Sequence, residues 1–121
     1  MANVIVVDDD DAVRGIIMRI VVAEGHTVRG APDGAAASKL MSDLAADLII
    51  SDVYMPKMDG IEVLIRLQNE FPRVRIIVMS GGGSIGTRDV LDIAASLGAR
   101  ATLAKPISHS QLRDAIAKAL A

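Results

Sequence analysis

The fold is decided by the stretch VIVVDDDD, Val4 to Asp11, in which a short apolar run passes directly into four carboxylates. Continuously apolar, β-branched runs of this length are typical of strands that are buried on both faces of a parallel sheet. Four further runs of this kind follow along the chain. The second and fifth of the five runs contain more polar residues or glycine than the others. The predicted strands are Val4–Val7, Thr27–Gly30, Leu48–Ser51, Ile76–Met79 and Ala101–Ala104.

Segments with helical spacing of apolar residues separate or follow these strands. They cover residues 11–23, 34–45, 60–70, 87–97 and 109–120. Asp33 is placed to cap the second helix, and Ser108 with Gln111 forms a capping-box pattern before the fifth. Five strand–helix units predict a doubly wound α/β fold: a five-stranded parallel sheet of order 2-1-3-4-5, flanked by five helices, flavodoxin-like. The length of 121 residues predicts one domain over residues 1–121.

The composition excludes several classes of function. Aromatic residues make up only 2% of the chain and the net charge is −2, so neither a base-stacking platform nor a basic surface for nucleic acid is expected. The absence of cysteine excludes disulfides and thiolate metal sites. No signal peptide precedes the first strand, and no apolar run approaches the ~18–20 residues of a membrane span. We therefore expect a cytoplasmic protein without a membrane partner.

Polar residues of unusual type stand directly after four of the five predicted strands. Asp8 and Asp9 follow the first strand, Asp52 the third, Ser80 the fourth and Lys105 the fifth. In doubly wound folds, ligands bind beyond the carboxyl ends of the strands. These five side chains are therefore expected to meet at one edge of the sheet.

Such a set of side chains suits phosphoryl transfer. Carboxylates ~4 Å apart repel each other by roughly 4 kcal/mol at an effective dielectric near 20, so a cation is needed among them. Oxygen ligands favour Mg²⁺, and Mn²⁺ would fit the same set. Asp52 could then attack phosphorus and form an acyl phosphate, with Lys105 and Ser80 contacting the transferred oxygens. Taken singly, each residue has a plainer explanation, and for Asp10 and Asp11 we expect a solvated turn or a helix cap.

Four motifs together resemble the receiver domain of response regulators. They are VVDD at 6–9, ISDVYMPKMDG at 50–60, VMSG at 78–81 and LAKP at 103–106. The resemblance covers nearly the whole chain and implies a signalling domain, not an enzyme beyond its own phosphorylation and dephosphorylation. It implies that Asp52 accepts the phosphoryl group from a sensor histidine kinase or phosphotransfer protein.

The resemblance also implies the roles of the neighbouring groups. Mg²⁺ would be held by Asp8, Asp9, Asp52 and the backbone carbonyl of Tyr54. Ser80 and Lys105 would contact the phosphoryl group, and the bond from Lys105 to Pro106 would be cis. Signalling would pass to a downstream protein through the fourth helix, fifth strand and fifth helix, a face that could also form a homodimer.

Two features depart from the family pattern. The position three residues before the lysine usually carries an aromatic ring, and here it is Thr102, so a swinging ring cannot transmit the signal. The glycine-rich segment from Gly81 to Gly86 is longer than usual, and we expect it to move over the phosphorylated site.

The last helix reaches residue 120 without a linker after it, which favours a switch that acts on its own.

Other readings remain open at the level of sequence. The triplet Asp9, Asp11 and Val13 resembles the nucleophile motif of haloacid-dehalogenase-type Mg²⁺ phosphohydrolases, with Asp9 as nucleophile. A degenerate receiver that only binds partners is a further alternative. On the first helix, Val13 and Ile16 adjoin the acidic run, and we expect them to remain partly exposed as a docking patch for the kinase.

Overall fold

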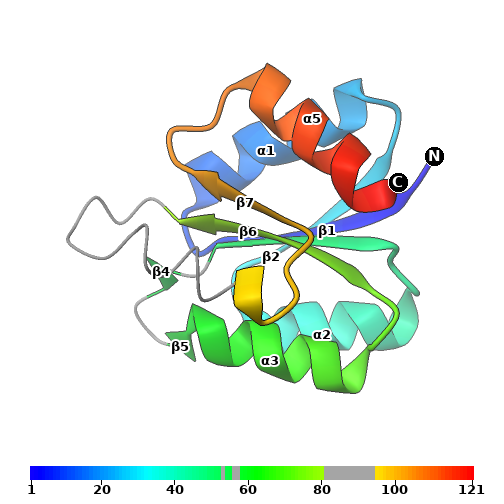
Figure 1. The fold of residues 1–121 in the computed structure, drawn as a ribbon, viewed down its shortest axis with the longest axis vertical. Helices are drawn as coiled ribbons and strands as arrows, with labels where there is room; N and C mark the ends of the chain where they lie inside the picture. Colours follow the sequence, from blue (N-terminus) through cyan, green and yellow to red (C-terminus); the bar gives the residue numbers. More distant parts are fainter. Residues whose placement is uncertain (53, 56–57, 81–94) are drawn as a thin grey trace.

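The computed structural model of the chain describes residues 1–52, 54–55, 58–80 and 95–121. Its main sheet has five parallel strands in the order β2-β1-β3-β6-β7 (Figure 1), which confirms the predicted order 2-1-3-4-5. The strands are β1 (Asn3–Val7), β2 (Thr27–Ala31), β3 (Leu48–Asp52), β6 (Arg75–Ser80) and β7 (Ala101–Ala104). A small antiparallel pair, β4 (Tyr54–Met55) with β5 (Met58–Asp59), follows β3.

The register of the strands brings the polar residues to one edge. Val7 in β1 pairs with Ser51 in β3, so Asp8 and Asp52 are each one residue further along. Ser80 in β6 pairs with Ala104 in β7, which places Lys105 one residue beyond that pair. The carboxyl ends of four adjoining strand segments therefore converge, as the sequence predicts.

Helices cover both faces of the sheet. α1 (Asp11–Ala23) and α5 (His109–Leu120) lie on one face, while α2 (Gly34–Asp43) and α3 (Gly60–Glu70) lie on the other (Figure 1). α2 ends two residues earlier than predicted, because the backbone of Leu44 is extended and only its N–H still bonds to the helix, at Leu40 O. The predicted helix 87–97 lies mostly outside the described residues, and the glycine-rich segment 81–86 lies wholly outside them.

The expected helix caps are present. The Asp33 side chain accepts a hydrogen bond from the Ala36 N–H at 2.8 Å. Ser108 and Gln111 form the reciprocal capping box predicted for the last helix. Gly25 follows α1 with a φ of 91°, a left-handed conformation that glycine adopts without strain.

The core consists of two aliphatic layers separated by the sheet. Alternate residues of the central strands point to opposite faces: Ile5 and Ile49 pack with α2 and α3, whereas Val6 and Ile50 pack with α1 and α5. All five residues of β3 are buried, as befits a strand covered on both sides. Among the described helices, none combines the length and the apolar character that a membrane crossing would need.

Candidate functional site

Three carboxylates meet at the carboxyl edge of the sheet. Asp8, Asp9 and Asp52 each offer an oxygen atom, and these atoms all lie within 4.8 Å of one another. Asp8 and Asp52 are buried at the ends of their strands, whereas Asp9 is exposed. Asp8 Oδ1 accepts a hydrogen bond from the Asp10 N–H at 2.9 Å, which orients that carboxylate.

Lys105 bridges two of these carboxylates from the end of β7. Its Nζ lies 2.9 Å from Asp8 Oδ2 and 2.9 Å from Asp52 Oδ2, and its side chain is 20% exposed. Burial alone would lower the pKa of Lys105. Its hydrogen bonds with Asp8 and Asp52, together with their charges, outweigh this effect, so the pKa is raised above its ordinary value. The ammonium group is therefore firmly charged at neutral pH.

Ser80 ends β6 beside this cluster. Asp52 pairs with Met79 across the two strands, so Ser80 lies one residue beyond the partner of Asp52. Ser80 is fully buried, and its Oγ has no hydrogen-bond partner among the residues that the structure describes. Buried hydroxyls are normally satisfied, so Ser80 keeps a donor that no described residue uses.

Two of the acidic residues after β1 serve the helix that follows. Asp10 is the N-cap of α1, where its side chain accepts hydrogen bonds from the N–H groups of Ala12 and Val13. Asp11 lies in the first turn of α1 and forms an ion pair with Arg14. Both positions agree with the expected cap and solvated turn, and carboxylates there favour the positive end of the helix dipole.

Arg14 is a residue of the site that sequence reasoning missed. One of its guanidinium nitrogens donates to the backbone carbonyl of Asp8 at 2.7 Å, so it ties α1 to the end of β1. Gly30 makes room for it, because a Cβ at Gly30 would lie 2.8 Å from Met18 Sδ and 3.1 Å from Arg14 Cδ. The sequence signal that could have identified Arg14 is its position one turn after Asp10, the predicted helix cap.

The structure also describes the other residues that the sequence analysis singled out. The Lys105–Pro106 bond is cis, as the family resemblance implies. Tyr54 belongs to β4, two residues after Asp52. Thr102 in β7 is half-buried. On α1, Val13 is half-buried and Ile16 is 54% exposed, so both side chains remain partly exposed as expected.

The donor set fits a divalent cation. Three carboxylates face one ammonium group, which leaves an excess of negative charge at a partly buried edge of the sheet. Oxygen-only ligands with this charge suit Mg²⁺, which is commonly bound through one or two carboxylates and keeps part of its water shell.

Comparison with known proteins agrees with this arrangement. The family model of the response regulator receiver domain matches residues 4–117. The chain is 31% identical over 118 residues to sporulation initiation phosphotransferase F of Bacillus subtilis, covering 98% of this chain and 93% of that protein. It is also 34% identical to the transcriptional regulator NtrC of Azospirillum brasilense and 35% identical to the sensor kinase CckA of Brucella abortus, each over 98% of the chain. It spans only 24% and 12% of those two longer proteins.

Solved structures give the same result. A receiver domain protein from Clostridium thermocellum matches with a TM-score of 0.89 and 25% identity, over 99% of this chain and 94% of that one. The receiver domain of NtrX from Brucella abortus matches with a TM-score of 0.87 and 28% identity, over 97% of both chains. These matches give no support to the phosphohydrolase alternative. Receiver domains are signalling domains that interact with histidine kinases or phosphotransfer proteins. The chain belongs to the family of response regulator receiver domains, the phosphoacceptors of two-component systems.

Proposed function

We propose that residues 1–121 act as one switch domain and that Asp52 is its phosphoacceptor. The observation that carries this assignment is the contact of Lys105 Nζ with Asp52 Oδ2 at 2.9 Å in the three-carboxylate cluster. Asp52 ends the central strand β3, which lies between β1 and β6. The acceptor therefore has Asp8 on one side and Ser80 on the other.

The other two carboxylates are less suited to accept the phosphoryl group. Asp8 is fully buried, and both of its oxygens are engaged, one by the Asp10 N–H and one by Lys105. Asp9 is exposed to water in the turn before α1. Asp8 and Asp9 are better placed as metal ligands, together with Asp52 and the backbone carbonyl of Tyr54. Bound Mg²⁺ would neutralise charge on the transferred phosphoryl group.

The reaction is a transfer of the phosphoryl group from a phosphohistidine of the donor protein. A carboxylate oxygen of Asp52 forms a bond to phosphorus while the bond from phosphorus to the imidazole nitrogen breaks, and that nitrogen retains the electron pair. Lys105 donates to one phosphoryl oxygen and Ser80 to another. Because phosphorylation adds a charge of roughly −1.5 to −2, Lys105 gains a stronger partner than the carboxylates it holds beforehand.

The partner surfaces follow from the same arrangement. The donor is a sensor histidine kinase or a phosphotransfer protein, and the apolar side chains of Val13 and Ile16 beside the acidic cluster form its docking patch. The output surface is the face of the fourth helix, fifth strand and fifth helix. β7 and α5 form its described part, and Lys105 lies between them at the site, whereas the predicted helix 87–97 lies mostly outside the described residues. It is also the face for any homodimer.

The test is Mg²⁺-dependent labelling by acetyl phosphate, followed by mass spectrometry of the intact protein. Wild type is expected to gain one phosphoryl group, and Asp52→Asn none. Asp9→Asn is expected to retain labelling only at higher Mg²⁺ concentration. Labelling of Asp52→Asn at the wild-type rate would refute the assignment of Asp52. Phosphatase turnover that is lost in Asp9→Asn but kept in Asp52→Asn would instead support the phosphohydrolase alternative.

A further inference from the structure

A hollow lies at the opposite edge of the same sheet from the acidic cluster. It has a volume of about 840 Å³ and lies between the ends of α2 and α3 and the beginnings of β3 and β6. Asp47 and Arg75, which line it, stand at the starts of the strands that end in Asp52 and Ser80. Strands of this length span roughly 16 Å at about 3.3 Å per residue, so the hollow is well separated from the acidic cluster.

Three arginines line this hollow without a matching set of free carboxylates. Arg73, Arg75 and Arg100 form no ion pair with any residue in the described part of the chain. The lining holds only two acidic residues among the described part of the chain, so its arginines are in excess. Glu70 pairs with Arg66 at 3.0 Å, and Asp47 accepts a hydrogen bond from the Asn3 N–H at 2.9 Å.

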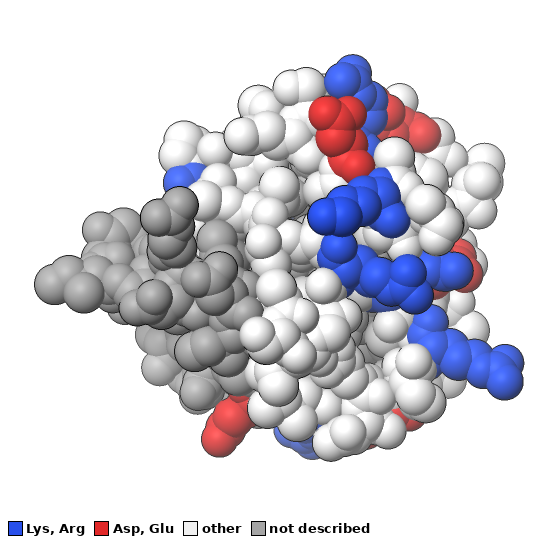
Figure 2. Space-filling model, in the orientation of Figure 1, with Lys and Arg blue, Asp and Glu red and all other residues white. Residues whose placement is uncertain are grey.

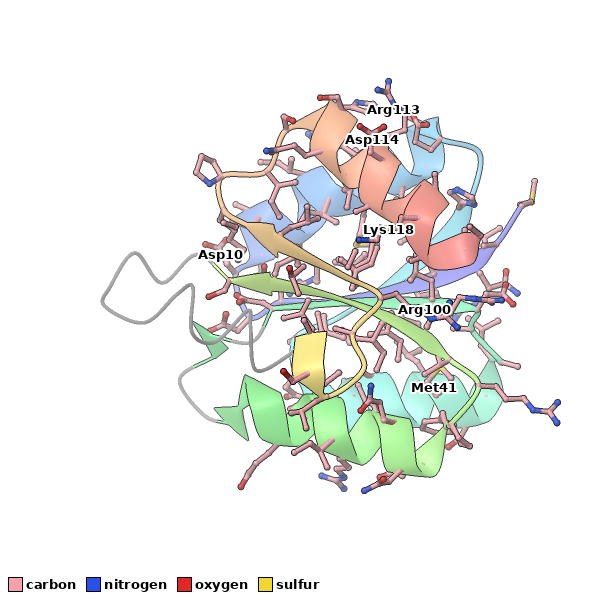
Figure 3. The ribbon with its side chains drawn as sticks, in the orientation of Figure 1. Asp10, Met41, Arg100, Arg113, Asp114 and Lys118 are labelled. Carbon is pink, nitrogen blue, oxygen red and sulfur yellow. The ribbon has the colours of Figure 1, made fainter. Side chains whose placement is uncertain are left out.

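Arg75 carries a donor atom that no described residue satisfies. Its Nε is buried and has no hydrogen-bond partner within the described residues. A donor that is removed from water without an acceptor is costly, so an anion bound to the guanidinium group of this half-buried arginine would be favoured. Lys and Arg also gather in a band on the side of the molecule where Arg100 and Lys118 are labelled (Figures 2 and 3).

The rest of the lining is apolar. Met41 from α2 and Arg100 from the segment before β7 lie near each other (Figure 3), and Phe71 and Val74 complete the apolar part. Phe71 is half-buried, packs against the core and lines the hollow. Guanidinium groups bind phosphates in a bidentate manner, and rings and thioethers accept a flat apolar body. The volume is within the range of about 300–1,000 Å³ that small-molecule sites occupy.

We propose that this arginine-lined hollow binds a nucleoside polyphosphate, with the phosphates on Arg73, Arg75 and Arg100 and the base against Phe71 and Met41. The shape is a hollow bounded by several elements, which suits a small molecule better than an extended acidic peptide. Occupation of this site would add a second input to the domain, beyond phosphorylation of Asp52.

The experiment uses the intact chain with ATP as the probe, in EDTA so that no metal links ATP to the acidic cluster. Binding is measured by calorimetry, and the Nε–H resonances of the arginines are followed by NMR. ATP is expected to saturate one site and to shift the resonances of Arg75 and Arg100. Adenosine and inorganic tripolyphosphate are each expected to bind about ten-fold more weakly or worse, since each lacks one half of the contacts.

Two variants complete the test. Arg100→Gln removes an exposed guanidinium of the hollow and is expected to weaken ATP binding by about ten-fold, the loss of one charge-assisted hydrogen bond. Arg113→Gln, exposed on α5 and outside the lining, is the matched control and should bind as wild type. Both variants should still be labelled at Asp52, so the outcome is independent of the phosphoacceptor assignment.

Several results would overturn the proposal. They are absence of saturable ATP binding, equal affinity of wild type and Arg100→Gln, and tripolyphosphate binding as tightly as ATP. Binding of an acidic peptide in place of ATP would equally overturn it and would assign the hollow to a protein partner.

Discussion

Ser80 and Ser51 are two buried serines at strand ends with different surroundings. Ser51 Oγ is 3.4 Å from the Asp52 carbonyl, whereas Ser80 Oγ has no partner in the described part of the chain. A buried hydroxyl without a partner costs about 1–3 kcal/mol. Ser80 therefore gains nothing for stability from its hydroxyl within the described residues, in line with the proposal that this hydroxyl binds the phosphoryl group.

We therefore predict that Ser80→Ala leaves the free energy of unfolding unchanged or raises it by up to about 1 kcal/mol, while phosphorylation of Asp52 becomes slower. Urea unfolding and acetyl phosphate labelling measure the two effects. Ser51→Ala is the control and should keep the labelling rate. A clear loss of stability in Ser80→Ala would show that the hydroxyl has a structural role.

Lys105 is the counter-charge of two buried carboxylates. We predict that Lys105→Met lowers the free energy of unfolding by about 3 kcal/mol, because Asp8 and Asp52 then remain buried without a cation. Addition of Mg²⁺ should restore most of this loss. Urea unfolding with and without Mg²⁺ tests the prediction, with the exposed Lys39→Met as control. An equal response of both variants to Mg²⁺ would contradict it.

Among the elements, α5 shows how local chemistry sets a boundary. Ser108 accepts from the Gln111 N–H at 3.1 Å, and the Gln111 side chain accepts from the Ser108 N–H at 3.0 Å. We predict that Ser108→Ala destabilises the protein by about 1 kcal/mol through loss of this cap. Thermal unfolding measures the change. Ser42→Ala, an exposed serine within α2, should have an effect below about 0.5 kcal/mol, and equal losses in both variants would refute the capping effect.

The elements were predictable where a local rule acts, and less so where tertiary contacts decide. The strands with apolar runs and the caps at Asp33 and Ser108 are visible in the sequence, since periodicity and hydrogen bonding act over a few residues. The convergence of Asp8, Asp52 and Lys105 followed from the topology rule for parallel sheets. The contact of Arg14 with the Asp8 carbonyl and the hollow beside Arg75 depend on how separate elements pack, which no local pattern specifies.

At the scale of the whole fold, the sheet divides the core into two layers, which share no side chain among the residues that the structure describes. Ile76 belongs to the layer with α2 and α3, and Ile116 to the layer with α1 and α5. We predict that Ile76→Val and Ile116→Val each cost about 1 kcal/mol, and that the double variant loses the sum within about 0.5 kcal/mol. Urea unfolding of all three variants tests this. A larger deviation from additivity would show that the two layers are energetically coupled through the sheet.

The strand order also has a kinetic consequence. β1 and β3 are direct neighbours, so pairing them brings Asp8 and Asp52 together, whereas Lys105 arrives only when β7 docks on β6 at the far end of the sheet. Until then the two carboxylates repel each other without a counter-charge. Dissolved divalent cations should therefore speed up refolding itself, and sodium chloride should do so more weakly, by screening.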